Sequence, residues 1–275
     1  MMNWVRRLLR LVGIALLAPV VFLLGCQSRL IYYPRPYGED HLAQARKAGV
    51  VALEYRTGEG RQVVHYVPPT SGAVTSPRRI WVCFAGNGSL ALDWLFMRSS
   101  WAAEDACLLV DYPGYGLCEG KPNPARIRAS ARAAVEALVR HQGTSVEEMT
   151  PRLAVLGHSI GCAAGLMLAH DLGVQRIVLI SPFTTMTEMG RRVLGWPLCY
   201  LNLHRFNNRH HLAAVVQKGA KVTVLHGQKD DIIPVEMSRE LAAAHPQAVK
   251  LTEIPDAGHN DILDFADAQI REALE

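Results

Sequence analysis

A serine flanked by two glycines is the feature of this sequence that most directly suggests chemistry. The Gly-x-Ser-x-Gly motif around Ser159 follows an apolar run, residues 153–156, and leads into an apolar segment with helical spacing, residues 162–171. A sharp turn from strand to helix needs glycines beside the serine, and it presents the hydroxyl at the carboxyl edge of a sheet. This context predicts a nucleophile at Ser159 rather than a purely structural glycine turn.

A carboxylate and a histidine follow two later predicted strands. A serine hydroxyl is a weak nucleophile near neutral pH, so a histidine must accept its proton and an acid must orient that histidine. Asp230 follows the predicted strand 222–225, and His259 follows the predicted strand 249–254. Both should lie at the same sheet edge as Ser159, in the chain order serine, acid, histidine. Asp231 is the neighbouring alternative to Asp230, and we expect it to face solvent.

Short apolar runs alternate with longer helical patterns along most of the chain, which predicts the α/β class. Parallel neighbouring strands require crossovers, so the pattern favours a mostly parallel sheet of about eight strands with helices on both faces. The first two strands, joined by residues 57–60, should form an antiparallel hairpin. Residues 183–217 are the one long irregular region, a possible cap insertion whose apolar residues we expect to pack. The predicted strands are residues 50–55, 62–67, 80–84, 107–111, 153–156, 177–180, 222–225 and 249–254, and the main helices are 125–141, 162–171, 235–244 and 261–274.

These motifs together resemble the α/β-hydrolase family from about Val50 to the C-terminus. In that family the acid lies in an H-G-x-x-D pattern at a strand end, which matches Asp230, and the histidine lies in a G-H loop, which matches His259. The oxyanion hole should combine the N–H of Ile160, the residue after the nucleophile, with one from the loop after the third strand. That loop is similar to the family's His-Gly-Asn-Gly turn. The resemblance implies that the backbone N–H of Asn87 is the second donor of the oxyanion hole. Alanine at position 85 replaces the usual histidine of that turn.

The turns at residues 85–88 and 111–116 resemble the branch that contains acyl-protein thioesterases, monoacylglycerol lipases and serine-aminopeptidase-like proteins. The resemblance implies an α/β-hydrolase fold and cleavage of a small-molecule or lipid ester, or a thioester, through an acyl-enzyme on Ser159. Two alternatives stay open: an amidase or peptidase of the same fold, and a non-catalytic envelope lipoprotein that uses the scaffold for binding. The mechanism requires neither a cofactor nor a metal, so we expect none.

The other histidines and most cysteines are interpreted as structural. We expect His158 to pack beside the nucleophile and His226 to be a structural residue at a strand end. The stretch with His204, His210 and His211 should form a solvated basic face rather than a metal site, because no nearby carboxylate completes a ligand set. Cysteines 83, 107 and 162 should be buried apolar residues. Cys118 and Cys199 are read as loop residues that could pair in an oxidising compartment.

The N-terminus has the layout of a signal peptide. Three arginines, at positions 6, 7 and 10, precede a 15-residue apolar run that ends at Cys26. That run is short for a permanent span, which needs about 20 residues. It resembles the bacterial lipoprotein signal, which implies cleavage before Cys26 and lipidation of that cysteine; an uncleaved signal anchor is the alternative. The expected organisation is a signal peptide at 1–25, a tether at 26–49 that is extended over 28–40 and lies on the body, and a hydrolase domain at 50–275.

Composition and charge resemble those of an ordinary globular enzyme, and the leader places it outside the cytoplasm and beside a membrane. The chain has 275 residues, of which 49% are hydrophobic and 20% charged. Three of the 29 basic residues lie in the leader, which leaves 26 against 25 acidic residues in the rest of the chain. Nucleic-acid binding depends on clustered positive charge, so we expect no nucleic-acid partner. Gln27 after the cysteine is similar to lipoproteins sent to an outer membrane, so that membrane is the expected location in a Gram-negative host.

Overall fold

The protein is described by a computed structural model that covers residues 2–71 and 76–275. An eight-stranded sheet has the order β1-β2-β4-β3-β5-β6-β7-β8, in which β3 to β8 are all parallel and β2 runs antiparallel to both of its neighbours, β1 and β4. The fold is therefore that of an α/β hydrolase, as predicted. The strands are β1 (Val51–Thr57), β2 (Gly60–Val67), β3 (Ile80–Phe84), β4 (Ala106–Val110), β5 (Leu153–His158), β6 (Arg176–Ile180), β7 (Lys221–Gly227) and β8 (Val249–Ile254).

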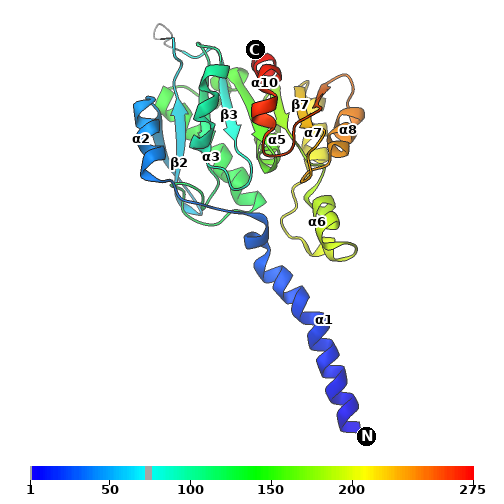
Figure 1. The fold of residues 1–275 in the computed structure, drawn as a ribbon. Helices are drawn as coiled ribbons and strands as arrows, with labels where there is room; N and C mark the ends of the chain where they lie inside the picture. The colour runs from blue at the N-terminus through cyan, green and yellow to red at the C-terminus, as the bar shows by residue number, and fades with distance from the viewer. Residues whose placement is uncertain (1, 72–75) are drawn as a thin grey trace.

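Helices cover both faces of the sheet (Figure 1). Residues alternate along each buried strand, so Val82 and Phe84 of β3 point to one face and Trp81 and Cys83 to the other. The helices are α1 (Met2–Ile31), α2 (Glu39–Lys47), α3 (Pro124–Gln142), α4 (Val146–Met149), α5 (Ile160–Leu172), α6 (Met186–Leu194), α7 (Asn208–Gln217), α8 (Val235–Ala244), α9 (Ile262–Phe265) and α10 (Asp267–Leu274), with short 3-10 helices η1 (Ala91–Ser100), η2 (Thr150–Arg152) and η3 (Leu198–Leu201).

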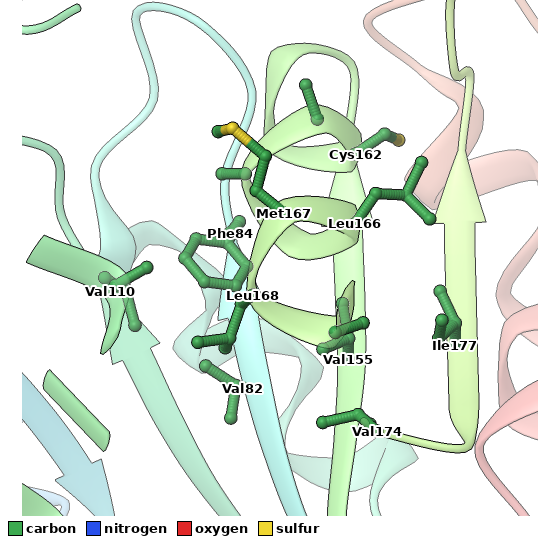
Figure 2. Packing of buried hydrophobic residues seen from close by; sticks show 14 of the residues in the cluster. Val82, Phe84, Val110, Val155, Cys162, Leu166, Met167, Leu168, Val174 and Ile177 are labelled. Atoms are coloured by element: carbon green, nitrogen blue, oxygen red, sulfur yellow. The ribbon is translucent and has the colours of Figure 1, made fainter. Parts of the chain in front are cut away.

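The central helix α5 is buried on nearly every side, because it packs on the sheet (Figure 2) and also contacts α3 and α7. Its small residues let it approach β3 and β5 closely. A Cβ atom on Gly165 would lie 2.5 Å from a methyl carbon of Val155, and one on Gly161 would lie 2.1 Å from the carbonyl oxygen of Phe84. Glycine is therefore required where α5 begins, directly behind Ser159.

The register of the parallel strands gathers their carboxyl ends at one edge. Phe84 of β3 is opposite Gly157 of β5, and His158 is opposite Ile180 of β6. On the next pair, Ile180 is opposite Leu225 of β7. The loops that follow these strands consequently meet around Ser159, as the sequence predicted for the catalytic edge.

The N-terminal segment differs from the prediction. Helix α1 continues past Cys26 to Ile31, and only residues 32–38 are extended before α2 begins. Among the described residues, Trp4–Ile31 is the one helix long and apolar enough to cross a membrane, a property that a signal sequence near the N-terminus shares. At about 1.5 Å per residue its 28 residues reach about 40 Å, so the whole helix is long enough to cross a membrane, although the 15-residue apolar run within it is short for a span. The polar residues 27 and 28 continue the helix instead of ending it.

The region 183–217 is more ordered than expected. Helix α7 packs against α5, so it belongs to the layer that covers the sheet and supplies the crossover from β6 to β7. Only α6 and η3 project as a cap. Met186 and Met189 of α6 pack against the core as expected, but Val193 and Trp196 are exposed. The helix predicted over 261–274 is interrupted between α9 and α10.

The predicted pairing of Cys118 with Cys199 is wrong, because both cysteines are free and buried. The sulfur of Cys118 lies 3.4 Å from both the backbone nitrogen and the backbone oxygen of Val63, against β2. Cys199 packs beside Gly190 in the cap. The two side chains were taken for loop residues, but each fills an apolar site in a different part of the fold. Burial raises the pKa of Cys118 to about 12.

The contact between α5 and β3 gives a first prediction. Gly161→Ala should lower the free energy of unfolding by more than about 3 kcal/mol, because its methyl group would collide with backbone rather than with a movable side chain. Urea denaturation measures this. Gly58→Ala is the matched control, since no described atom lies within 4 Å of a Cβ placed there, and it should change stability by less than about 1 kcal/mol. Equal midpoints for the two variants would contradict the argument.

Candidate active site

The turn at Ser159 has the strained backbone of a nucleophile turn. Ser159 has φ 56° and ψ −120°, and it is one of two described non-glycine residues with positive φ. A Cβ on Gly157 would lie 2.6 Å from the carbonyl oxygen of Gly161, so both glycines of the motif are sterically required. The Ser159 N–H donates to Ile180 O at 2.9 Å, which fixes the turn to the neighbouring strand. Strain of this kind costs about 1–3 kcal/mol and persists only where packing enforces it.

The three residues predicted to act together are brought together. His259 Nε2 lies 3.0 Å from Ser159 Oγ, and His259 Nδ1 lies 2.7 Å from Asp230 Oδ2. All three residues are buried. The carboxylate can only accept a hydrogen bond, so Nδ1 carries the proton and Nε2 is left to accept the serine proton. This arrangement can remove a proton from Ser159 as its oxygen attacks an electrophile.

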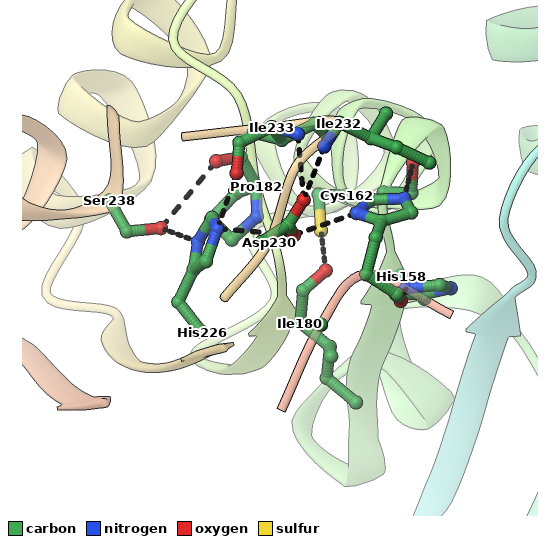
Figure 3. A network of polar contacts seen from close by, with 12 residues as sticks. His158, Cys162, Ile180, Pro182, His226, Asp230, Ile232, Ile233 and Ser238 are labelled. Atoms are coloured by element: carbon green, nitrogen blue, oxygen red, sulfur yellow. Dashed lines mark hydrogen bonds and ion pairs between the residues drawn. The ribbon is translucent and has the colours of Figure 1, made fainter. Parts of the chain in front are cut away.

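The carboxylate of Asp230 is surrounded by donors (Figure 3). Its Oδ1 accepts from the backbone N–H groups of Ile232 at 3.0 Å and Ile233 at 2.7 Å. Its Oδ2 faces His259 and also lies 3.3 Å from His226 Nε2. Burial alone raises the pKa of Asp230, but the hydrogen bonds from the two histidines and from Ile233 outweigh burial and hold the pKa well below its usual range. Asp230 therefore stays ionised while it orients His259.

Two further histidines support this arrangement without touching Ser159 Oγ. His226 Nε2 lies 2.8 Å from Ile233 O and its Nδ1 lies 2.6 Å from Ser238 Oγ, which holds the loop that carries Asp230. His158 Nε2 donates to the carbonyl of His259 at 3.2 Å. Burial, followed by the neighbouring His259, lowers the pKa of His158 to about 3, so it is neutral. Both histidines are packed structural residues, as the sequence indicated.

The loop after β3 is held by tyrosines in place of the histidine that Ala85 replaces. Tyr112 Oη donates to Ala85 O at 2.5 Å, and Tyr115 Oη donates to Asn87 Oδ1 at 2.8 Å. The backbone N–H of Tyr33 also donates to Asn87 Oδ1, at 3.1 Å. Tyr112 and Tyr115 belong to the turn 111–116, which the sequence assigned to loop geometry. Nothing in the sequence pattern pointed to Tyr33, because its partner lies 54 residues away.

The remaining histidines do not form the simple basic face that was expected. His204 is half-buried, and its ring nitrogens lie 3.1 Å from Tyr32 Oη and 3.4 Å from Ser28 Oγ. His210 and His211 of α7 lie against His170 of α5, which sequence reasoning did not single out. One ligand atom from each of these three lies within 4.8 Å of the others, a group that could hold a metal ion. Burial is the main cause that lowers the pKa of His170 and of His211. The positive charges of nearby Lys218 and Arg128 lower the pKa of His170 further, and Arg128 also that of His211, so these charges disfavour a cation there.

A cavity of about 340 Å³ lies away from Ser159, between α6 and α8. Charged side chains of both signs surround it, so it resembles a solvated groove between two helices rather than a pocket for an acyl group. Its lining consists of Thr184, Glu188, Arg191, Arg192, Glu236, Met237 and Glu240.

Comparison with known proteins agrees with the geometry. Residues 81–214 match the model of the alpha/beta hydrolase family. An uncharacterised protein of Mycobacterium tuberculosis, Rv2307c, is 32% identical over 245 residues, which is 88% of this chain and 83% of that protein. The chain belongs to the alpha/beta hydrolase family.

Two solved structures share the fold of this chain at low sequence identity. An esterase of Pyrococcus furiosus has a TM-score of 0.67 at 16% identity, over 89% of this chain and 96% of the esterase. A thioesterase domain from the curacin biosynthetic pathway has a TM-score of 0.57 at 11% identity, over 82% of this chain and 99% of that domain. At these identities the two structures support the fold of the chain and nothing more specific.

The two adjacent aspartates give a second prediction. Asp230→Asn should lower kcat on a soluble short-chain ester by about 10³–10⁴-fold, because a neutral amide no longer orients the required tautomer of His259. Asp231→Asn is the matched control. Its side chain is exposed, so its kcat should stay within about twofold of wild type. If purified, folded Asp231→Asn lost more kcat than Asp230→Asn, the acid that orients His259 would be Asp231 instead.

Proposed function

We propose that this chain is a membrane-tethered serine hydrolase that cleaves carboxylic ester or thioester bonds. One observation carries the proposal: His259 bridges Ser159 Oγ at 3.0 Å and the Asp230 carboxylate at 2.7 Å, on a turn strained in the way a nucleophile requires. Membership of the alpha/beta hydrolase family and the likeness in fold to an esterase and a thioesterase domain support the reaction class.

The first half of the proposed reaction acylates Ser159. His259 Nε2 takes the hydroxyl proton as Ser159 Oγ attacks the carbonyl carbon of the substrate. The backbone N–H groups of Ile160 and Asn87 stabilise the oxyanion, and α5 begins at Ile160, so the positive end of its dipole faces that charge. The tetrahedral intermediate then expels the alcohol or thiol, which leaves with the proton that His259 holds.

The second half restores the enzyme. A water molecule gives a proton to His259 Nε2 and attacks the acyl carbon, and the carboxylic acid leaves as the proton returns to Ser159 Oγ. Throughout, Asp230 stabilises the imidazolium form of His259 by its negative charge. His259 accepts and donates the proton in every step. The products contain only the atoms of the substrate and of one water molecule.

The N-terminal segment supplies the proposed tether. We propose cleavage before Cys26 and lipidation of that cysteine, so that residues 26–49 link the membrane to the hydrolase domain 50–275 in the cell envelope. The arginines that precede the apolar run and the cysteine that ends it support this reading. Each buried methylene of an acyl chain contributes about 0.8 kcal/mol to anchoring.

A fluorophosphonate probe tests the nucleophile. The wild-type protein should be labelled and Ser159→Ala should not, because only an activated serine oxygen attacks the phosphorus. Ser181→Ala is the control, since Ser181 is also buried, also has positive φ and also lies at the carboxyl edge, but its Oγ has no hydrogen-bond partner among the described residues. Labelling of folded Ser159→Ala at the wild-type rate would end the covalent mechanism.

Intact mass spectrometry of the membrane fraction tests the tether. The mature chain should begin at Cys26 and carry added acyl mass, and Cys26→Ser should stay unprocessed or lose that mass while fluorophosphonate labelling of Ser159 persists. A mature protein that retains Met1, or that begins at Cys26 without acyl mass, would contradict lipidation. The protein would then be held by a helical anchor or secreted freely.

A further inference from the structure

The cap carries a group of exposed apolar side chains. We define the cap face as Val193, Trp196, Leu198, Tyr200 and Leu203, whose exposed fractions range from 37% for Leu198 to 81% for Val193. Single exposed apolar residues are ordinary on a protein surface, but five within eleven residues are not. Met186 and Met189 of α6 pack on the core, whereas Val193 at the end of α6 and the four cap-face residues that follow the helix are exposed.

The cap face is fastened to the N-terminal helix. Gln27 of α1 donates through Nε2 to Leu201 O at 2.8 Å, and its Oε1 accepts from the N–H of Leu203 at 2.7 Å. The Gln27 side chain is buried although it lies on a helix whose other residues are almost all exposed. One amide group thus clamps the segment beside Cys26 to the backbone of the cap, and Figure 1 shows α1 leaving the body on the side where α6 lies.

The same helix end is also fastened to the edge that carries Ser159. Asn87 Nδ2 donates to Ile31 O at the last residue of α1, in the loop proposed to supply an oxyanion donor. The cap chain itself starts just after Ile180, whose carbonyl accepts the Ser159 N–H. The membrane-proximal residues, the cap and the candidate nucleophile therefore share one end of the molecule.

Basic side chains border the cap face. Arg191 and Arg192 directly precede Val193, and Arg205 follows Leu203, with all three exposed. The Arg205 guanidinium donates to the backbone carbonyl of Tyr200 at 3.1 Å, which holds its charge at the backbone of the cap face. Apolar and aromatic residues edged by arginine are typical of segments that lie in the interface of a bilayer with anionic headgroups.

We propose that the cap face lies in the interfacial layer of the bilayer that holds the N-terminal segment, and that the substrate of Ser159 is an acyl ester or thioester whose chain enters from that bilayer. The substrate class rests on the proposed hydrolase function, but the docking of the cap does not. Docking is also independent of whether lipid or helix forms the tether, because Gln27 and Ile31 both follow Cys26 in the chain.

Quenching by brominated lipid tests the docking directly. The full-length protein is reconstituted in phosphatidylcholine vesicles in which about one lipid in five is the anionic phosphatidylglycerol. One set of vesicles carries brominated acyl chains and the other does not. The loss of tryptophan fluorescence caused by the brominated lipid should be larger for the wild-type protein than for Trp196→Phe. Trp81, Trp94 and Trp101 are buried in the body, and Trp4 is common to both proteins, so the difference reports Trp196.

A matched pair of charge substitutions tests the route of the substrate. Val193→Glu should lower the rate on a long-chain ester dissolved in the vesicles by about tenfold or more, an effect of about 1.4 kcal/mol, while the rate on a soluble short-chain ester stays unchanged. Val51→Glu is the control and should change neither rate. Val51 pairs with Tyr66 at the end of β2 that meets the start of β4, so it lies at the opposite edge of the sheet from Ser159.

The possible failures are distinguishable. Equal quenching of wild type and Trp196→Phe, or equal effects of Val193→Glu and Val51→Glu on vesicle substrate, would overturn the proposal. If Val193→Glu instead converts a dimer into a monomer and Trp196 is not quenched, the cap face binds a second copy and the proposal is wrong. A wild-type protein that hydrolyses neither ester refutes the proposed hydrolase function, and the quenching result then decides the docking alone.

Discussion

The close approach of three backbones at Ser159 is the constraint on which the rest of the structure depends. Strand β3, strand β5 and the start of α5 come so near one another that no Cβ fits on Gly157 or Gly161, and Ser159 is forced to positive φ. A turn of this kind is unfavourable by itself. It is maintained because α5 is buried by the sheet and by neighbouring helices, so that relaxing the turn would open the largest apolar cluster of the protein.

Buried charge is the second organising element. The carboxylate of Asp230 is kept ionised inside the fold because two backbone N–H groups and two histidines supply donors to it. An unpaired buried carboxylate would take up a proton and could no longer stabilise an imidazolium. His226 contributes to this by fixing the loop between β7 and α8, and His158 contributes by holding the backbone of His259. The polar network is therefore larger than the three residues that do the proposed chemistry.

The N-terminal segment is structurally part of the site region rather than a passive leader. Gln27 binds the cap, Tyr33 and Ile31 bind Asn87, and Tyr37 Oη donates to the buried carboxylate of Asp111 at 2.5 Å, beneath the turn that positions the tyrosines. Such contacts couple the position of the N-terminal helix to the geometry of the loop after β3. This coupling explains why a segment that looks like a mere tether lies across the body instead of extending into solvent.

The amino-acid pattern was enough to predict the fold class, the hairpin at the edge of the sheet and the three residues that meet at the carboxyl ends of the strands. These features follow from local rules: the period of apolar residues distinguishes strands from helices, and only a Gly-x-Ser-x-Gly turn fits between a strand and a helix so closely packed. Tertiary structure alone decided the partners of Gln27, Tyr33 and His204, the burial of Cys118 and Cys199, and which side of the cap faces outward. Most of these depend on contacts between segments tens of residues or more apart, where no periodicity in the chain records which side chains will meet.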